Sequence, residues 1–137
     1  MSYESRHENL KKRTKEFAIR VLNLVDTLPN TVSGRTIGNQ LARCGTSVAA
    51  NYRSACRARS NADFISKLTV VEEETDESAF WIELLVEKGL TRLERVSELL
   101  NEADQLTAIW VSSINTARGK KRELRTPPSA LRTGKNA

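Results

Sequence analysis

Apolar residues recur at helical spacing in four segments of the chain. In residues 6–28 they stand three or four positions apart, which is the pattern of an amphipathic helix with one buried face. Residues 61–88 and 91–117 repeat this pattern. The expected core positions of the three segments are Leu10, Thr14, Phe17, Ala18, Val21, Leu24, Val25, Leu28, Phe64, Leu68, Val71, Thr75, Ala79, Ile82, Val86, Val96, Leu99, Ala103, Leu106, Trp110 and Ala117. Because no segment alternates apolar and polar residues as a half-buried strand does, the pattern predicts helices and no strands.

The fourth segment, residues 33–60, combines three faces on one expected helix. Its core face consists of Ile37, Leu41, Cys44, Val48 and Ala55. Beside it lies a seam of mostly small residues, Gly38, Ala42, Gly45, Ala49, Tyr52 and Cys56. The opposite face carries four cations, Arg35, Arg43, Arg53 and Arg57. The alternating spacing of four and three in the seam predicts close packing against another helix.

Three of the expected helices begin at hydroxyl side chains, which cap helix N-termini well. These predicted caps are Ser33, Ser60 and Thr91. An acid follows three residues after two of them, Asp63 after Ser60 and Glu94 after Thr91, as in a capping box.

The connections between the expected helices are short. Pro29 and Asn30 are expected to end the first helix, and Gly89 the third. Since short connections place consecutive helices antiparallel, we predict an all-α fold, an up-down-up-down four-helix bundle over residues 1–118. Residues 119–137 lack packing periodicity and are predicted to form a flexible basic tail.

Length and composition fit one folded domain, with 137 residues of which 39% are hydrophobic and 28% charged. No apolar run is long enough for a membrane span, and the first residues are too polar for a signal peptide. Cys44 and Cys56 lie three turns apart on one expected helix, too far apart to form a disulfide with each other. We therefore expect a cytoplasmic protein with reduced thiols.

The net charge of +5 is concentrated near the C-terminus. From Arg118 onward there are seven basic residues and one acid, whereas the first 117 residues carry fifteen basic and sixteen acidic side chains. Arg118, Lys120, Lys121 and Arg122 could therefore form a basic arm that follows a phosphate backbone, although a solubilising tail fits the same residues.

Three stretches carry a resemblance to a known family, namely LPNTVSGRTIGNQLARCGTSVAANYRSACRARS, NADFISKLTVVEEETDESAFWIELL and QLTAIWVSSINTAR. Over roughly residues 8–120 the chain resembles the bacterial four-helix-bundle proteins of 23S rRNA intervening sequences, most specifically in Thr46–Tyr52 after Gln40–Arg43. The resemblance implies a non-enzymatic bundle that assembles into a homopentameric ring. A related branch, the accessory variability determinant protein of diversity-generating retroelements, binds nucleic acid and a reverse transcriptase through basic surfaces. Cys44 in place of Ser, and Tyr52–Ala55 in place of Ile-x-Glu-Gly, indicate a subgroup.

The residues give little support for catalysis. His7 is the single histidine, and no Glu-x-x-His pair exists for a di-iron site, despite the acids among Glu72–Glu77. The two cysteines lie on predicted packing faces, and no glycine-rich phosphate loop is present. We predict no enzyme activity, no catalytic residue, no metal site and no cofactor.

The outer side of the third helix carries a candidate subunit contact. Phe80 and Leu84 are expected to project on the same side as Glu73 and Glu77, away from the core. Apolar residues beside acids on an outer face favour an oligomer interface, in which these acids meet arginines of a neighbouring subunit. The alternative is that this helix is central and covered on both sides within one chain.

The arginine face of residues 33–60 is the strongest candidate for function, because guanidinium groups match phosphate geometry. We expect a non-catalytic, oligomeric accessory protein that contacts RNA or DNA backbone through Arg35, Arg43, Arg53 and Arg57 and the basic tail, without sequence-specific readout. One alternative is that these arginines pair with Glu72–Glu77. The protein would then be a protein-only scaffold or partner-binding module.

Overall fold

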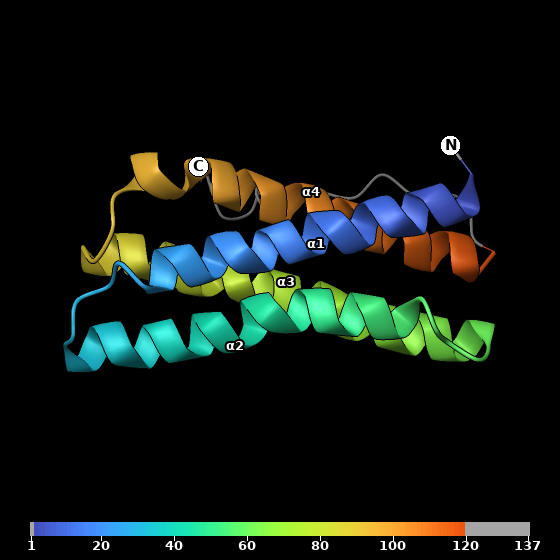
Figure 1. Cartoon of the computed structure of the whole chain (residues 1–137), viewed down its shortest axis with the longest axis horizontal. Helices are drawn as coiled ribbons and strands as arrows, with labels where there is room; N and C mark the ends of the chain where they lie inside the picture. Colours follow the sequence, from blue (N-terminus) through green and yellow to red (C-terminus); the bar gives the residue numbers. More distant parts are fainter. Residues whose placement is uncertain (1, 120–137) are drawn as a thin grey trace.

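The computed structural model describes residues 2–119, which form four long α-helices lying side by side (Figure 1). The helices are α1 (Tyr3–Val25), α2 (Val32–Ala55), α3 (Asn61–Lys88) and α4 (Leu93–Ala117). The predicted all-α four-helix bundle is therefore confirmed. The tail prediction concerns residues 120–137 almost entirely, and these lie outside the described residues.

Consecutive helices pack against each other along the bundle, while α1 and α4 touch over a smaller area. The α1–α4 contact includes a two-pronged ion pair, in which Nε and Nη2 of Arg13 donate to the Glu102 carboxylate at 2.6 and 2.9 Å. Most of the largest fully buried side chains lie on the predicted stripes: Phe17, Val21, Leu41, Val48, Leu68, Val71, Ile82, Val96, Leu106 and Trp110. Leu85, next to the predicted stripe of α3, is fully buried as well. Each helix thus turns its apolar face inward, as the periodicity predicts.

One polar pair is built into this core. The indole Nε1 of Trp110 donates to Thr75 Oγ1 at 3.0 Å, and that hydroxyl donates to the Val71 carbonyl at 2.7 Å. Both Trp110 and Thr75 are fully buried. Burial of the indole N–H is therefore compensated by a partner on α3, as a buried donor requires.

The small-residue seam of α2 packs against α1. Gly45 lies directly against Val21, and Gly38 lies near the side chains of Val25 and Leu28. Glycine inside a helix costs about 1 kcal/mol relative to alanine, and the close approach of the two helices explains why it is retained here. The predicted close packing of this seam against another helix is confirmed.

Two of the predicted helix boundaries are confirmed in atomic detail. Ser60 Oγ accepts a hydrogen bond from the Asp63 backbone N–H at 3.0 Å, and the Asp63 carboxylate accepts from the Arg59 N–H at 3.2 Å. At the other end of α3, Gly89 adopts a left-handed conformation with φ of 82°. Only glycine adopts this conformation without a steric cost, so it ends the helix.

Two predicted N-caps are wrong. Thr31, not Ser33, caps α2, since its Oγ1 accepts from the Gly34 N–H at 3.1 Å. The chain can turn this early because residue 34 has no side chain: a Cβ there would lie 2.1 Å from the Pro29 carbonyl oxygen.

Thr91 is the other incorrect prediction. The N-cap of α4 is Arg92, whose side chain makes no capping hydrogen bond, and the helix begins at Leu93. Because the N-cap is Arg92, Thr91 lies outside the helix and Glu94 is its second residue instead of its third, so no capping box forms. An acid in the first turn still interacts favourably with the helix dipole.

The first helix is shifted towards the N-terminus relative to its predicted span of 6–28. It begins at Tyr3, where Ser2 Oγ accepts from the Ser5 N–H at 3.1 Å, and it ends at Val25. The Thr27 hydroxyl then donates to the Leu24 carbonyl at 2.7 Å. The chain leaves the helix before Pro29, because a residue preceding proline is disfavoured in helical conformation.

Candidate nucleic-acid interface

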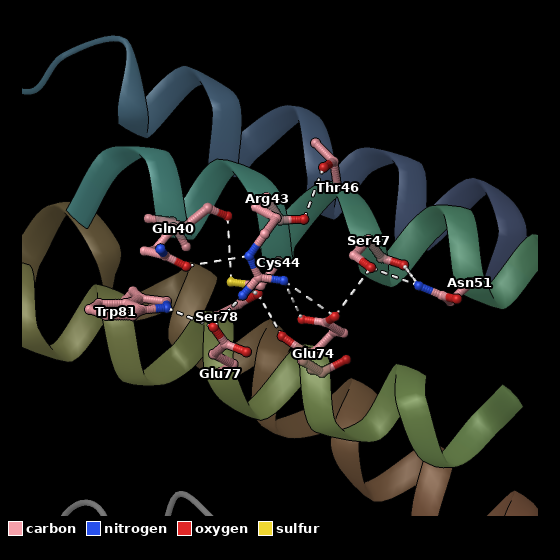
Figure 2. A network of polar contacts seen from close by, with 12 residues as sticks. Gln40, Arg43, Cys44, Thr46, Ser47, Asn51, Glu74, Glu77, Ser78 and Trp81 are labelled. Atoms are coloured by element: carbon pink, nitrogen blue, oxygen red, sulfur yellow. Dashed lines mark hydrogen bonds and ion pairs between the residues drawn. The ribbon is translucent and has the colours of Figure 1, made fainter. Parts of the chain in front are cut away.

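Arg43 is held by carboxylates of its own chain (Figure 2). Its Nη1 lies 3.3 Å from Glu74 Oε1, its Nη2 forms a short hydrogen bond to Glu77 Oε2, and its Nε donates to Gln40 Oε1 at 3.3 Å. The pairing of α2 arginines with α3 acids, which the sequence left as an alternative, therefore occurs at Arg43. Half of the Arg43 side chain is nevertheless exposed.

The network continues along α2 and α3. Ser47 Oγ donates to Glu74 Oε2 at 3.4 Å, and Asn51 Nδ2 donates to Ser47 Oγ at 2.7 Å (Figure 2). On α3, Trp81 Nε1 donates to Glu77 Oε2 at 3.1 Å. Polar contacts of this kind hold the two helices in register, so the middle of the α2 arginine face serves packing within the chain.

Arg35 lies at the opposite end of α2 from Arg53 and Arg57. It is exposed, and its Nη1 donates to Asn30 Oδ1 at 2.8 Å. At a rise of about 1.5 Å per residue, Arg35 and Arg53 are separated by roughly 27 Å along the helix axis, and Arg57 lies beyond the end of the helix. The four predicted arginines therefore do not form one continuous contact surface.

Arg53 and Arg57 are exposed. Arg53 lies in the last turn of α2, and Arg57 follows the Cys56 C-cap. Neither guanidinium pairs with another group in residues 2–119. These two side chains are the part of the predicted α2 site that is available to an outside ligand.

Other elements bring further arginines to the same end of the bundle, which we call the basic end. The N-terminus of α1, the α2–α3 connection and the C-terminus of α4 all lie there (Figure 1). They carry Arg6, Arg59 and Arg118, all exposed. Of the predicted tail contacts only Arg118 is in the described part of the chain, while Lys120, Lys121 and Arg122 lie outside it.

A pocket of about 730 Å³ opens at the basic end, where residues from all four helices meet. Its aromatic and imidazole rings come from Tyr52, Phe64 and His7. The His7 and Phe64 rings are parallel within 4°, with centroids 6.4 Å apart, and Tyr52 meets His7 edge-on at 6.2 Å. In the sequence His7 stands out only as the single histidine, and this pocket was not predicted, because its lining residues are far apart in the chain.

Of the side chains in the predicted subunit contact on α3, some are exposed and others already contact groups of the same chain. Phe80 is half-exposed and Glu73 is exposed. Leu84 is partly buried against the core, and Glu77 binds Arg43 and Trp81 of the same chain. Phe80, whose ring meets Trp81 edge-on at 4.9 Å, is therefore the clearest apolar feature of this surface.

The two cysteines are free thiols, as predicted. Cys44 is fully buried and accepts a hydrogen bond from Ser78 Oγ at 3.3 Å, whereas Cys56 is partly buried at the wall of the pocket. Burial raises the pKa of the Cys44 thiol to about 11 and also raises that of Cys56. Among residues 2–119, no helix has both the length and the apolar character needed to cross a membrane.

Comparison with known proteins assigns the chain to a family. The family described as 23S rRNA-intervening sequence protein matches residues 6–112, a range that includes most of each of the four helices. The chain belongs to this family. The resemblance seen in the sequence is thereby confirmed.

A solved structure from Bacteroides thetaiotaomicron is similar to this member of the family. It is described as a protein with unknown function from the S23 ribosomal protein family. The two chains are 35% identical, with a TM-score of 0.71, and the similarity covers 76% of this chain and 96% of the other. No curated protein matches the chain.

Proposed function

We propose that this protein is a non-catalytic accessory protein that binds the phosphate backbone of RNA or DNA in the cytoplasm. The observation that carries the proposal is the basic end, where Arg53 and Arg57 are exposed and have no partner in residues 2–119. Arg6, Arg59 and Arg118 lie at the same end. Compared with the sequence-based hypothesis, the contact surface moves from the length of α2 to its C-terminal end, since Arg43 is paired with Glu74 and Glu77.

Two features support a phosphate partner. Guanidinium groups bind phosphate through paired hydrogen bonds, and several of them on different elements can follow a polymer backbone. The basic tail starts directly after Arg118, so Lys120, Lys121 and Arg122 would add cations to the same region of the polymer. The description of the family refers to 23S rRNA, which makes RNA the first polymer to test.

We further propose that the protein acts as a homo-oligomer, a pentamer by the resemblance described above. Repetition of a weak basic site in one assembly would increase the overall affinity. Phe80 is the expected centre of the subunit contact, with Glu73, Glu77 and Leu84 around it. A reverse transcriptase or another protein is a further class of partner, which these surfaces would bind in addition to nucleic acid.

The test is a salt titration of binding to single-stranded and duplex RNA and DNA of mixed sequence. Neutralising phosphates with cationic side chains makes the affinity fall steeply with salt. The double change Arg53→Gln and Arg57→Gln should weaken binding at all sequences and reduce the salt slope by about one for each phosphate that is no longer neutralised. Arg35→Gln removes the same type of charge at the far end of α2 and is the matched control. Absence of binding even at low salt would instead support a protein-only scaffold.

Assembly is tested separately by light scattering. Phe80→Ser should dissociate the oligomer, whereas Leu93→Ser, which changes an apolar side chain of similar exposure at the start of α4, should not. Phe80 is 50% exposed and Leu93 54%, so neither change opens a cavity in the core. An unchanged mass of the Phe80→Ser assembly would show that this surface of α3 is not the subunit interface.

A further inference from the structure

The pocket at the basic end has the chemistry of a ligand site. Its volume of about 730 Å³ lies within the range of small-molecule pockets, roughly 300–1,000 Å³. Leu10, Ala55, Leu68 and Ile109 provide apolar lining, while Ser112, Ser113 and Thr116 of α4 provide hydroxyl groups. The site can therefore hold a flat, mainly apolar body and form hydrogen bonds to its edge.

The charged side chains that line the pocket are of one sign. Arg6 and Arg59 are among its lining residues, and no residue that lines it within the described chain is an aspartate or glutamate. The nearby acid Asp63 is already bound by the Lys67 ammonium at 2.8 Å and by the Arg59 backbone N–H. An anionic group is thus favoured at the mouth.

We propose that this pocket takes the base of an unpaired nucleotide, while the phosphate of that nucleotide binds Arg6 and Arg59. The proposal deepens the function proposed above and rests on it for the polymer to which the nucleotide belongs. The base would contact the His7 and Phe64 rings, since each aromatic face offers a stacking surface to any base. A base within a duplex is stacked and paired and cannot enter, so the pocket selects single-stranded segments and ends.

His7 is suited to this role in its neutral form. Burial, assisted by the neighbouring cations Lys11 and Arg6, lowers the pKa of His7 below 6.5. A neutral imidazole can stack on a base and both donate and accept a hydrogen bond. A phosphate bound at Arg6 would reverse part of the cationic effect and raise the pKa again. The resonances and the pKa of the His7 ring should therefore respond to both the base and the phosphate of a bound nucleotide.

The first experiment uses the fact that His7 is the single histidine of the chain, so its ring resonances need no assignment by mutation. The full-length protein is titrated with a nucleoside 5′-monophosphate, the matching nucleoside and inorganic phosphate. We expect the nucleotide to shift the His7 ring protons through the ring current of the base and to raise the pKa of His7. Inorganic phosphate should raise the pKa with only a small ring-current shift. No response of His7 to the nucleotide at millimolar concentration would overturn the proposal.

The second experiment compares two apolar side chains. Phe64→Leu keeps an apolar side chain at the pocket, whereas Leu93→Ala shortens an exposed apolar side chain at the start of α4, outside both the pocket and the proposed subunit contact. Because stacking on one base accounts for about tenfold or more in affinity, Phe64→Leu should weaken binding of single-stranded oligonucleotides about tenfold and leave duplex binding unchanged. His7→Gln, which removes the imidazole ring and keeps a hydrogen-bonding side chain, should act in the same direction. Equal weakening by the Phe64 and Leu93 variants would contradict the pocket.

The two proposals fail in different ways. If oligonucleotides bind with a steep salt dependence but Phe64→Leu has no effect, the backbone function stands and the pocket proposal is overturned. If polymers do not bind while the mononucleotide still shifts His7, the pocket proposal stands and the polymer function is overturned. Circular dichroism of each variant verifies that the helices are intact.

Discussion

A Cβ atom placed on Gly45 of α2 would lie 2.6 Å from Cγ1 of Val21 on α1, and 3.0 Å from two further atoms of that valine. Real Cβ atoms do not approach a neighbour so closely, so one helix would have to move. The absence of a side chain at this position therefore sets the spacing between α1 and α2. This close approach defines a first prediction.

Gly45→Ala should destabilise the protein by about 1–2 kcal/mol. A contact of 2.6 Å places the overpacking cost in the upper part of its usual range, at about 2–3 kcal/mol, and the gain in helix propensity offsets only about 1 kcal/mol of it. Chemical denaturation measures the change. Gly38→Ala is the comparison: its Cβ would lie 3.3 Å from the tip of Leu28, a side chain that can rotate, so the destabilisation should be smaller. The double variant with Val21→Ala should be destabilised by less than the sum of the two single changes. A Gly45→Ala protein as stable as the parent would contradict this account.

The buried hydrogen bond between Trp110 and Thr75 leads to a second prediction. Thr75→Val leaves the indole N–H buried without its acceptor and should cost about 1–3 kcal/mol. Thr107→Val is a matched control, since that buried hydroxyl bonds the Ala103 carbonyl at 2.8 Å and its removal leaves no buried donor unpaired. Thermal or chemical unfolding of both variants compares them. Equal destabilisation would mean that the Thr75–Trp110 bond contributes nothing specific.

The two thiols should differ in reactivity. Cys44 is fully buried with a pKa of about 11, whereas Cys56 is partly exposed at the pocket. Since the thiolate is the reactive species, iodoacetamide at pH 8 should modify Cys56 first and reach Cys44 only after unfolding. Mass spectrometry of the peptides gives the order of reaction. In denaturant the two should react at similar rates, and faster reaction of Cys44 in the folded state would show that α2 opens.

The protonation of His7 should couple to folding. The pKa of His7 is lower in the folded protein than the ordinary value of 6.5, so the unfolded chain binds the proton more readily. The contribution of neutral His7 to the stability of the fold is therefore fully present above pH 6.5 and is lost as the pH falls from 6.5 through the pKa of His7 in the folded protein. The difference in unfolding free energy between the parent and His7→Gln isolates this contribution from the carboxylates. A parent protein whose stability rises relative to the variant on acidification would contradict the sign.

The sequence predicts the helices well because their faces are set by local spacing. Core positions such as Leu41, Cys44 and Val48 follow from the 3.6-residue period, and Ser60 and Gly89 act through contacts within three or four residues. The cap of α2 could not be predicted from a hydroxyl alone. The position of this cap depends on the tight turn at Pro29, which is possible only because residue 34 has no side chain.

The candidate site was less predictable. Whether an arginine of α2 stays available depends on the rotation of α3 beside it: Arg43 faces Glu74 and Glu77, but Arg53 and Arg57 lie beyond those acids. The pocket depends on the packing of four chain segments. No local pattern brings His7, Phe64 and the serines of α4 together, and the lone histidine was its only signal.

The guanidinium groups at the basic end make the two ends of the bundle different in charge. The basic end carries five arginines against Glu4, Glu8 and Asp63, whereas at the other end Arg35, Lys88, Arg92 and Arg95 are nearly balanced by Asp26, Glu87 and Glu94. In a closed cyclic assembly every subunit has the same orientation relative to the symmetry axis. A ring whose axis follows the helices would thus have one cationic rim and one nearly neutral rim, and an anionic strand would approach it preferentially from the cationic side.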